Sequence, residues 1–567
     1  MHCTWRFRDN GDGREPDGLA AWAKELNISL LLARMLWRRG VVTREAMDVF
    51  LGPNLRHLPP LEGWPELIQA AEHLAGELQK GKTLAVWGDY DVDGITATAV
   101  VADFLRRRGY KVLTHLPHRM DEGYGLNREG LEELAAQGAE CLLTVDCGVS
   151  DIEAVERARE LGLSVVVTDH HASEGSLPNA RAVVNPRLQD TPYFQAAGVG
   201  VAWLLMAALN RMLPGPADDI RRYLDLVALG TIADVVQLTP ENRILVKNGL
   251  LLLGEAKRPG IFALKEVSRI PPASTLGSGQ VGFSLAPRIN AAGRMGSADT
   301  ALELLLAPDL STARPLAAKL ETFNQKRRSE EEAILGEALQ QAEEQKDDPG
   351  LVLYSPEWHQ GVIGIVASRV AERYHRPVLL LSREGERLKG SGRSIPEFDL
   401  FQGLVDCRES LLGYGGHPQA AGLSLSEDRI EDLRAAFSAA VRSQLGEKLP
   451  EPSLQLEARL GLEMVDMQLI KEIDLLQPFG PGNPQPLFCS NPLAVRKHKV
   501  FGGKHVSLEV RDESAGKTML GKAWRQVETL GSEVAGKNVR LAFTPRLNTY
   551  NGLISIDLHI RDWEICS

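Results

Sequence analysis

Cysteine is scarce in this sequence of 567 residues. The six cysteines include no Cys-x-x-Cys pair and are few for a chain of this length. Neither a disulfide framework nor a zinc site is therefore indicated. Any bound metal ion would have to be held by carboxylates and imidazoles.

Long apolar segments are also missing. The longest uncharged run, residues 193–210, contains Gln195 and Asn210 and falls short of a membrane-spanning helix. The first residues contain no apolar segment of the signal-peptide type. We therefore expect a cytoplasmic protein that does not associate with membranes.

Positive charge is in short supply overall, because the formal net charge is −11. This balance argues against a basic coat over the whole molecule but does not exclude a local basic groove. Residues 491–550 reverse the balance, with eleven Lys and Arg against five Asp and Glu. A basic segment with interleaved aromatic residues is typical of a single-strand nucleic-acid surface, although it could also be merely basic. The aromatic candidates are Phe501, Trp524, Phe543 and Tyr550.

The order of apolar runs predicts an α/β protein of several domains. Between residues 80 and 240, short runs such as 141–145 and 163–168 alternate with helix-like stretches such as 96–109, as in βαβ units with a parallel sheet. Short alternating strands after residue 450 predict a small β-barrel. The predicted domains are an N-terminal helical segment (1–70), a parallel-sheet α/β domain (71–315), one long charged helix (316–346), a smaller α/β domain (347–448) and the barrel (449–567).

Three carboxylates, Asp89, Asp91 and Asp93, follow a predicted strand at alternate positions. Carboxylates this close repel one another unless a cation lies between them. An EF-hand calcium loop is excluded because its twelfth position must be a glutamate, and here it is Val100. An acidic surface turn is the remaining simple alternative. It is disfavoured because ligand sites in open parallel sheets lie at strand ends.

The same placement recurs further along the chain. Apolar runs lead directly into Asp146, into Asp169-His170-His171 and into Asp234. Strand ends of a parallel sheet converge on one crevice, so these groups could meet there. Mixed Asp and His ligands without thiolate suit Mn²⁺ or Mg²⁺, with imidazole favouring Mn²⁺. The pattern predicts a two-metal site for phosphoester hydrolysis.

These motifs resemble those of the DHH phosphoesterase family. GDYDVDG (88–94), VDCG (145–148), TDHH (168–171) and GTIAD (230–234) occur in that family's order, and GYGGHPQAAG (413–422) resembles the motif of its DHHA1 domain. Other motifs resemble those of the family's bacterial exonucleases, which degrade single-stranded DNA 5′→3′ in DNA repair and recombination. The resemblance covers about residues 25–567. It implies a DHH catalytic domain, a connecting helix, a DHHA1-like domain and an OB-type barrel that guides the strand.

The resemblance also implies roles for individual residues. Asp91, Asp146 and Asp89 would hold one metal ion, and Asp93, Asp146, His170 and Asp234 the other, so that Asp146 bridges both. His171 would contact the scissile phosphate, and Asp169 would orient the histidines. In one respect the sequence departs from the family's small-substrate pyrophosphatases. They carry a histidine four residues before the position of Asp91, where this chain has Trp87.

A second group of residues would bind the strand. Glycines allow a phosphate to approach the backbone closely, and serine with arginine supplies charge-assisted donors for phosphate oxygens. By resemblance, Ser391, Arg393, Gly415, Gly416 and His417 would hold the 5′-terminal nucleotide. Four residues of the first domain would contact the backbone near the scissile bond, namely Arg119, Arg288, Asn290 and Arg294. For each arginine, a surface ion pair is the alternative.

Three functions compete at this point. The first is a processive single-strand DNA exonuclease that releases 5′-mononucleotides, with a single-strand-binding protein and a helicase as partners by resemblance. The second is a DHH hydrolase of short oligonucleotides, cyclic dinucleotides or pyrophosphate, which would not need the basic barrel. The third is a catalytically inactive replication scaffold, which would have lost metal ligands that this sequence retains. We favour the first.

Overall fold

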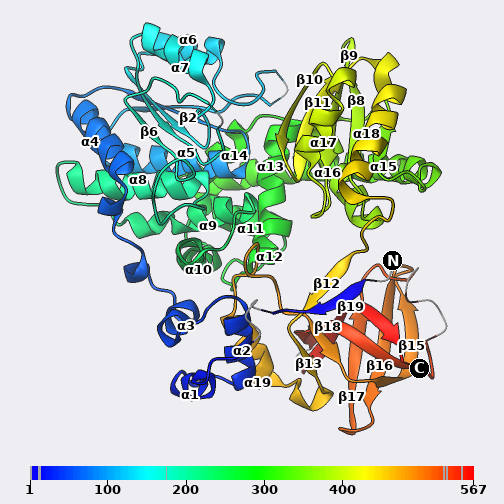
Figure 1. Ribbon diagram of the computed structural model, residues 1–567. Helices are drawn as coiled ribbons and strands as arrows, with labels where there is room; N and C mark the ends of the chain where they lie inside the picture. The colour runs from blue at the N-terminus through cyan, green and yellow to red at the C-terminus, as the bar shows by residue number, and fades with distance from the viewer. Residues whose placement is uncertain are drawn as a thin grey trace.

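The computed structural model describes residues 3–9, 14–119, 121–173, 175–527, 530, 534–550 and 553–566. Two α/β units lie next to each other in the upper half of Figure 1, and a β-barrel lies below them. The helix α15, Leu310–Glu344, connects the two units. It begins before the predicted residue 316, because the Asp309 side chain caps it by accepting a hydrogen bond from the Thr312 amide, and Pro315 is accommodated near its start.

The larger α/β unit contains a parallel sheet of five strands in the order β3-β2-β4-β5-β6. Its central strands are buried on both faces, which explains their continuous apolar sequence. The helices α6 and α7 pack on one face, around Trp87, and α4, α5 and α8 pack on the other. The strands are β2 Leu84–Gly88, β3 Val112–His115, β4 Cys141–Val145, β5 Ser164–Thr168 and β6 Ala182–Val184.

Helices make up the rest of this unit. Those that follow the sheet extend its core toward the barrel, and a single π-helical turn, η4 (Val281–Leu285), precedes α13. The α-helices are α4 Pro65–Gln79, α5 Val92–Arg107, α6 Arg128–Ala136, α7 Ile152–Glu160, α8 Gly198–Met212, α9 Leu224–Ala233, α10 Pro240–Glu255, α11 Pro259–Val267, α12 Ser278–Gln280, α13 Ala286–Met295 and α14 Asp299–Leu306.

The smaller α/β unit contains a mixed sheet in the order β10-β11-β9-β8-β7. Only β7 and β8 are parallel, and β10 is an exposed edge strand. The elements are β7 Leu351–Tyr354, α16 Gln360–Tyr374, β8 Val378–Glu384, β9 Arg387–Arg393, α17 Leu400–Asp406, β10 Gly413–His417, β11 Ala420–Leu425 and α18 Ile430–Leu445.

The C-terminal barrel has seven strands in the order β13-β14-β18-β15-β16-β17-β19, and a further pairing of β18 with β19 closes it. The helix α19, Met467–Leu475, packs beside it. The barrel strands are β13 Ala458–Leu460, β14 Phe488–Ser490, β15 Leu493–Phe501, β16 His505–Asp512, β17 Lys517–Ala523, β18 Asn538–Tyr550 and β19 Leu553–Ile565. The strand β12, Ser453–Leu456, precedes them and lies outside the barrel sheet.

The N-terminal segment packs against this barrel, which the sequence did not indicate. Strand β1, Thr4–Phe7, pairs with β12, and α1–α3 share one apolar core with the barrel strands. A buried ion pair joins Arg39 to Glu457, with 2.6 Å between Nη2 and Oε1. The segment contains α1 Leu19–Glu25, α2 Leu30–Arg38 and α3 Arg44–Leu51. Removing the barrel would therefore expose the N-terminal helices as well.

Candidate metal centre and phosphate-binding cleft

The acidic residues singled out in the sequence meet at one edge of the parallel sheet. Asp89 follows β2, Asp146 follows β4, and Asp169, His170 and His171 follow β5. Asp146 has a φ of 65°, a left-handed conformation that is rare outside glycine and that recurs at functional sites. The crevice at the strand ends therefore forms as predicted.

Asp234 reaches the crevice by a different route. We grouped Asp234 with the ligands at strand ends, although residues 221–230 before it are helix-like in sequence. The helix is confirmed as α9, and Asp234 is its C-cap. The position of Asp234 in the site is nevertheless as expected.

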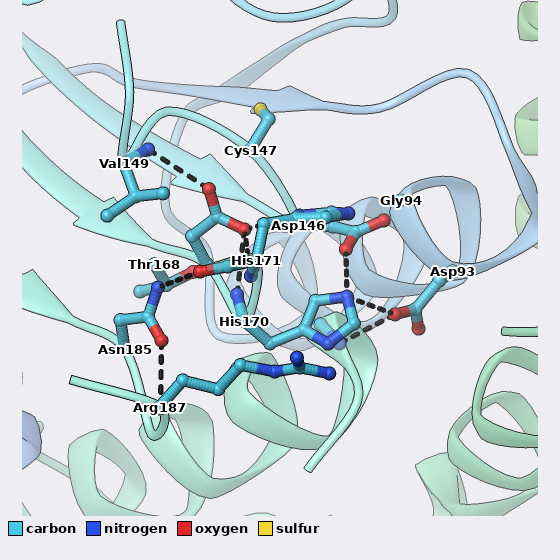
Figure 2. Close-up of polar contacts among 12 residues, drawn as sticks. Asp93, Gly94, Asp146, Cys147, Val149, Thr168, His170, His171, Asn185 and Arg187 are labelled. Carbon is cyan, nitrogen blue, oxygen red and sulfur yellow. Dashed lines mark hydrogen bonds and ion pairs between the residues drawn. The ribbon is translucent and has the colours of Figure 1, made fainter. Parts of the chain in front are cut away.

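Three overlapping groups of side chains could each hold a metal ion. They are Asp89, Asp91 and Asp146; Asp93, His170 and Asp234; and Asp146, His170 and His171. Within each group the potential ligand atoms lie within 4.8 Å of one another. Figure 2 shows the His170 ring between Asp146 and Asp93, with Nε2 3.0 Å from Asp146 Oδ1 and 3.7 Å from Asp93 Oδ2.

These atoms have the features of metal ligands. Asp89 Oδ1, Asp146 Oδ1 and both ring nitrogens of His170 are buried and make no hydrogen bond among the described residues. Such orphaned groups are rare and costly unless something else satisfies them. Burial lowers the pKa of His170 to about 3, so its ring is neutral and its nitrogen can donate an electron pair to a metal. The donor set fits Mn²⁺ or Mg²⁺.

The carboxylates also disfavour one another's charge. Burial, followed by the charge of Asp91, raises the pKa of Asp93 to about 7. Burial, followed by the charges of Asp93 and Asp91, raises the pKa of Asp234 to about 8. The pKa of Asp146 is raised as well, first by burial and then by Asp93. A divalent cation among these groups would remove this penalty.

Backbone groups fix two of the carboxylates. Asp91 is the N-cap of α5 and accepts hydrogen bonds from the amides of Asp93 and Gly94. Asp93 accepts from the amides of Gly198 and Val199 at the start of α8, at 2.6 and 3.0 Å. Both helix N-termini stabilise negative charge at this place.

Glycines allow the helices to approach so closely, and the sequence patterns did not reveal them. A Cβ added to Gly198 would lie 2.5 Å from the Cβ and Oδ1 atoms of Asp146, and one added to Gly230 would lie 2.8 Å from Asp93 Oδ1. Gly230 is the first residue of the GTIAD motif, so its close approach to Asp93 could have been suspected, whereas Gly198 lies outside every predicted motif.

Asp169 is fully occupied as a hydrogen-bond acceptor. It accepts from the backbone amides of Val149, His170 and His171 and from the His171 ring at Nδ1, at 2.7 Å. It therefore orients the ring of His171, whereas the His170 ring has no contact with it. Burial lowers the pKa of His171, but the hydrogen bond to Asp169 and nearby acidic charges outweigh burial and raise it to about 9. The hydroxyl of Tyr124, which the sequence did not suggest, lies 3.2 Å from the same nitrogen.

Trp87 takes no part in the crevice. Its side chain is fully buried among apolar residues beneath α6 and α7, and its ring lies 4.0 Å from that of His115. Where the small-substrate pyrophosphatases have a histidine, this chain therefore has a core packing residue. Among the described residues, the candidate ligand group around Asp91 contains only carboxylates.

A cluster of arginines faces the acidic crevice. Burial, followed by the charges of Arg119, Arg327 and Arg393, lowers the pKa of Arg294 to about 9. Arg119 and Arg294 belong to the larger unit, whereas Arg393 lies on β9 of the smaller one. Like charges gathered at low exposure are unfavourable unless an anion lies between them. Phosphate is the anion that arginine's planar fork fits best.

The other predicted strand-binding residues of the smaller unit lie near this cluster. Ser391 Oγ accepts a hydrogen bond from Arg393 at 3.1 Å. Gly415, Gly416 and His417 form the exposed edge strand β10. Gly416 has a φ of 140°, and a Cβ there would lie 2.5 Å from the Ala420 carbonyl oxygen. Only glycine fits at this position.

Two residues of α13 differ in their surroundings. Asn290 is partly exposed and lines a cleft of about 990 Å³ between the larger unit and the barrel. Arg288 is buried, pairs with Glu321 at 2.6 Å and donates to the Ser284 carbonyl. The expected backbone contact of Arg288 is therefore not supported, because its guanidinium already stabilises α13 against α15.

The barrel presents part of the predicted aromatic surface. Trp524 is 48% exposed, and its ring lies 5.7 Å from Phe501 and 4.9 Å from His505. Phe543 was wrongly predicted to belong to this surface, because it is fully buried and packs against Phe488. The side chain of Tyr550 lies outside the described residues.

Three family models match the chain. They are described as "DHH family, N-terminal domain" (residues 83–231), "DHHA1 domain" (347–443) and "RecJ OB domain" (456–562). The single-stranded-DNA-specific exonuclease RecJ of Dickeya dadantii is 37% identical over 578 residues, which cover 98% of both chains. This chain belongs to the RecJ family. RecJ of Escherichia coli is 36% identical, over 97% of this chain and 98% of its own.

Solved structures of the RecJ family have the same fold. The crystal structure of RecJ from Thermus thermophilus with Mn²⁺ matches with a TM-score of 0.84 and 32% identity, over 99% of this chain and 79% of that one. The same protein with Mg²⁺ matches with a TM-score of 0.78. The predicted combination of a DHH parallel sheet, a DHHA1 domain and an OB-type barrel is therefore confirmed. None of the described helices is long and apolar enough to cross a membrane.

Proposed function

We propose that this protein is a metal-dependent exonuclease that hydrolyses single-stranded DNA from the 5′ end and releases 5′-mononucleotides. The observation that carries this proposal is the meeting of a buried acidic crevice with an arginine cluster from two domains. The acidic crevice requires a cation, and the arginine cluster requires an anion such as phosphate. A phosphate of the substrate bound next to a metal ion would satisfy both. Relatives at 36–37% identity are named single-stranded-DNA-specific exonucleases.

In the crevice we assign the ligands of two divalent cations, Mn²⁺ first and Mg²⁺ as an alternative. Asp89, Asp91 and Asp146 form one set, because their ligand atoms cluster. Asp93, His170 and Asp234 form the other cluster, and we add Asp146 to it because its Oδ1 lies 3.0 Å from His170 Nε2. When bound, such a pair of ions activates water and stabilises charge on the phosphate. Asp169 holds His171 by its Nδ1 atom, which leaves Nε2 to contact the scissile phosphate.

The arginine cluster would hold the strand on either side of the scissile bond. Arg119 and Arg294 stand next to the crevice, and Arg393 with Ser391 provides donors from the smaller unit. The Gly415–His417 edge strand offers backbone amides to the 5′-terminal nucleotide. Asn290 lines the cleft toward the barrel and is proposed to contact the strand there.

The barrel would guide the incoming strand. The cleft beside Asn290 is also lined by Arg546 and Leu547 of β18, so it connects the larger unit with the barrel. Exposed Trp524 and the basic residues of 491–550 are suited to stack bases and contact phosphates without sequence preference. A hydrolase of cyclic dinucleotides or pyrophosphate would have no use for this surface.

We further propose the predicted domain division, with boundaries near residues 70, 315, 346 and 448. The enzyme would act in the cytoplasm in DNA repair and recombination, where a helicase and a single-strand-binding protein would supply and cover its substrate. Measuring whether the purified protein binds a helicase or a single-strand-binding protein would test the proposed partners.

The function is tested by comparing substrates under one set of conditions. With Mn²⁺ we expect release of mononucleotides from long single-stranded DNA, loss of that release with EDTA, and little hydrolysis of duplex DNA or cyclic dinucleotides. Faster hydrolysis of dinucleotides than of long strands would favour the small-substrate alternative. Strand binding without any hydrolysis would favour the scaffold.

A further inference from the structure

A fourth strand end opens onto the crevice, and its loop carries an arginine that the mechanism above does not use. The edge strand β6 is parallel to β5 and ends at Val184, directly before Asn185, Pro186 and Arg187. Its carboxyl end points the same way as those that carry the acidic residues, and such ends are where ligand sites gather in open parallel sheets.

This loop is tied to the histidine loop by a buried asparagine. Asn185 Nδ2 donates to the His171 carbonyl at 2.9 Å, and Asn185 Oδ1 accepts from the Arg187 amide at 2.9 Å (Figure 2). Gln189 accepts from the Asn185 amide and donates to the Val183 carbonyl. The backbone of Arg187 is therefore held in fixed relation to His171.

The side chain of Arg187, by contrast, is exposed and makes no ion pair among the described residues. In Figure 2 it extends from its loop toward the side of the site where His170 lies. The pKa of His417 in the smaller unit is lowered by burial and then by the positive charges of His171 and Arg187. Arg187 is thus within electrostatic reach of both the crevice and the edge strand β10.

The backbone of Arg187 is fixed beside His171, and its exposed guanidinium has no ion-pair partner among the described residues, so this group is available to bind an anion. The proposed function puts the terminal nucleotide between the metal-ligand candidates and Gly416–His417. We propose that Arg187 binds the phosphate at the 5′ end of the strand from its loop after β6. This inference rests on the proposed function and adds a second guanidinium to the end-binding group of Ser391 and Arg393.

The test compares strands that carry a 5′-phosphate with strands that carry a 5′-hydroxyl. Arg187→Ala should lower kcat/KM about tenfold on phosphorylated strands and less than about twofold on hydroxyl strands, as expected for the loss of a charge-assisted bond. Arg187→Lys, which keeps the charge but not the planar fork, should fall between. Arg181→Ala is the matched control, since Arg181 is exposed at the other end of β6, and it should leave both values unchanged.

A binding measurement separates this inference from the proposed function. Fluorescence anisotropy in EDTA should show that the full-length protein binds a 5′-phosphorylated oligonucleotide more tightly than the hydroxyl form, and that Arg187→Ala reduces this preference. This result does not depend on hydrolysis, so it would stand even if no nucleotide were released. An equal loss on both kinds of strand, or an unchanged preference in Arg187→Ala, would overturn the assignment.

Discussion

The acidic crevice and the arginine cluster each bring together side chains of like charge, negative in the crevice and positive in the cluster. The crevice gathers carboxylates at strand ends of one sheet, and Asp89 Oδ1, Asp146 Oδ1 and both ring nitrogens of His170 lack hydrogen-bond partners among the described residues. The cluster gathers arginines from two domains, and burial followed by the charge of Arg119 lowers the pKa of both Arg294 and Arg393. Each region is unfavourable by itself. Together they support the proposal that a cation and a phosphate meet between them.

The largest effect should come from breaking the acidic side of this pair. Asp146→Ala would remove the carboxylate shared between the ligand groups, so hydrolysis should fall at least about a thousandfold, while strand binding by the barrel persists. Turnover and anisotropy measured on the same sample would show both. Asp190→Ala, an exposed carboxylate on a nearby loop, is the control and should behave as wild type. Near-normal turnover of Asp146→Ala would refute the metal assignment.

A single methyl group should disturb the crevice without removing a ligand. In Gly198→Ala the new Cβ would lie 2.5 Å from Asp146, so the helix α8 or the carboxylate must shift, and we expect turnover to fall about a hundredfold. Gly200→Ala, on the same helix, meets its nearest neighbour at an ordinary 3.5 Å and should be active and slightly more stable. Equal activity of the two variants would show that the close approach is unimportant.

The arginine side should respond in a different kinetic parameter. Arg393→Ala should raise KM for single-stranded DNA about tenfold or more while Mn²⁺ affinity is unchanged, because its side chain lies in the other domain from the ligands. Arg387, exposed at the start of the same strand, provides the control. If Arg393→Ala weakened Mn²⁺ binding and left KM unchanged, the assignment of metal binding to the crevice and strand binding to the arginine cluster would be wrong.

Metal binding should depend on pH through the acidic side alone. Asp93 and Asp234, with pKa values of about 7 and 8, are protonated in the metal-free protein at low pH, and a cation must displace those protons. Mn²⁺ affinity should therefore fall as pH decreases from 8.5 to 6.5, by up to about tenfold per pH unit for each proton displaced. Titration of free Mn²⁺ by electron paramagnetic resonance would measure it. A pH-independent affinity would contradict the raised pKa values.

The smallest expected effect is on strand binding by the barrel. Because the barrel shares an apolar core with the N-terminal helices, which truncation near residue 450 would expose, it is tested with point variants. Lys499→Ala and Lys504→Ala should each reduce the slope of log affinity against log salt by about 0.7. Lys497 is already paired with Glu509 at 2.8 Å, and Lys497→Ala should change the slope less. Unchanged slopes in all three would remove the barrel from the strand path.

Much of the crevice could be predicted because its residues follow strands with recognisable sequence patterns. Asp89, Asp146 and His170 lie where the carboxyl ends of parallel strands must converge. The helix-like run before Asp234 was recognised, but its end was grouped with strand ends. Sequence could not show that Arg288 is paired with Glu321, that Phe543 is buried or that Arg187 lies within electrostatic reach of the crevice. Those facts depend on contacts between segments far apart in the chain.

The most direct test of the central claim is the digestion of one single strand labelled at either end, in Mn²⁺. If the crevice and the arginine cluster hold a 5′-terminal nucleotide between them, a 5′ label should appear at once as a mononucleotide, while a 3′ label should pass through progressively shorter strands. Release of the 3′ label first, or digestion that continues unchanged in EDTA, would contradict the account.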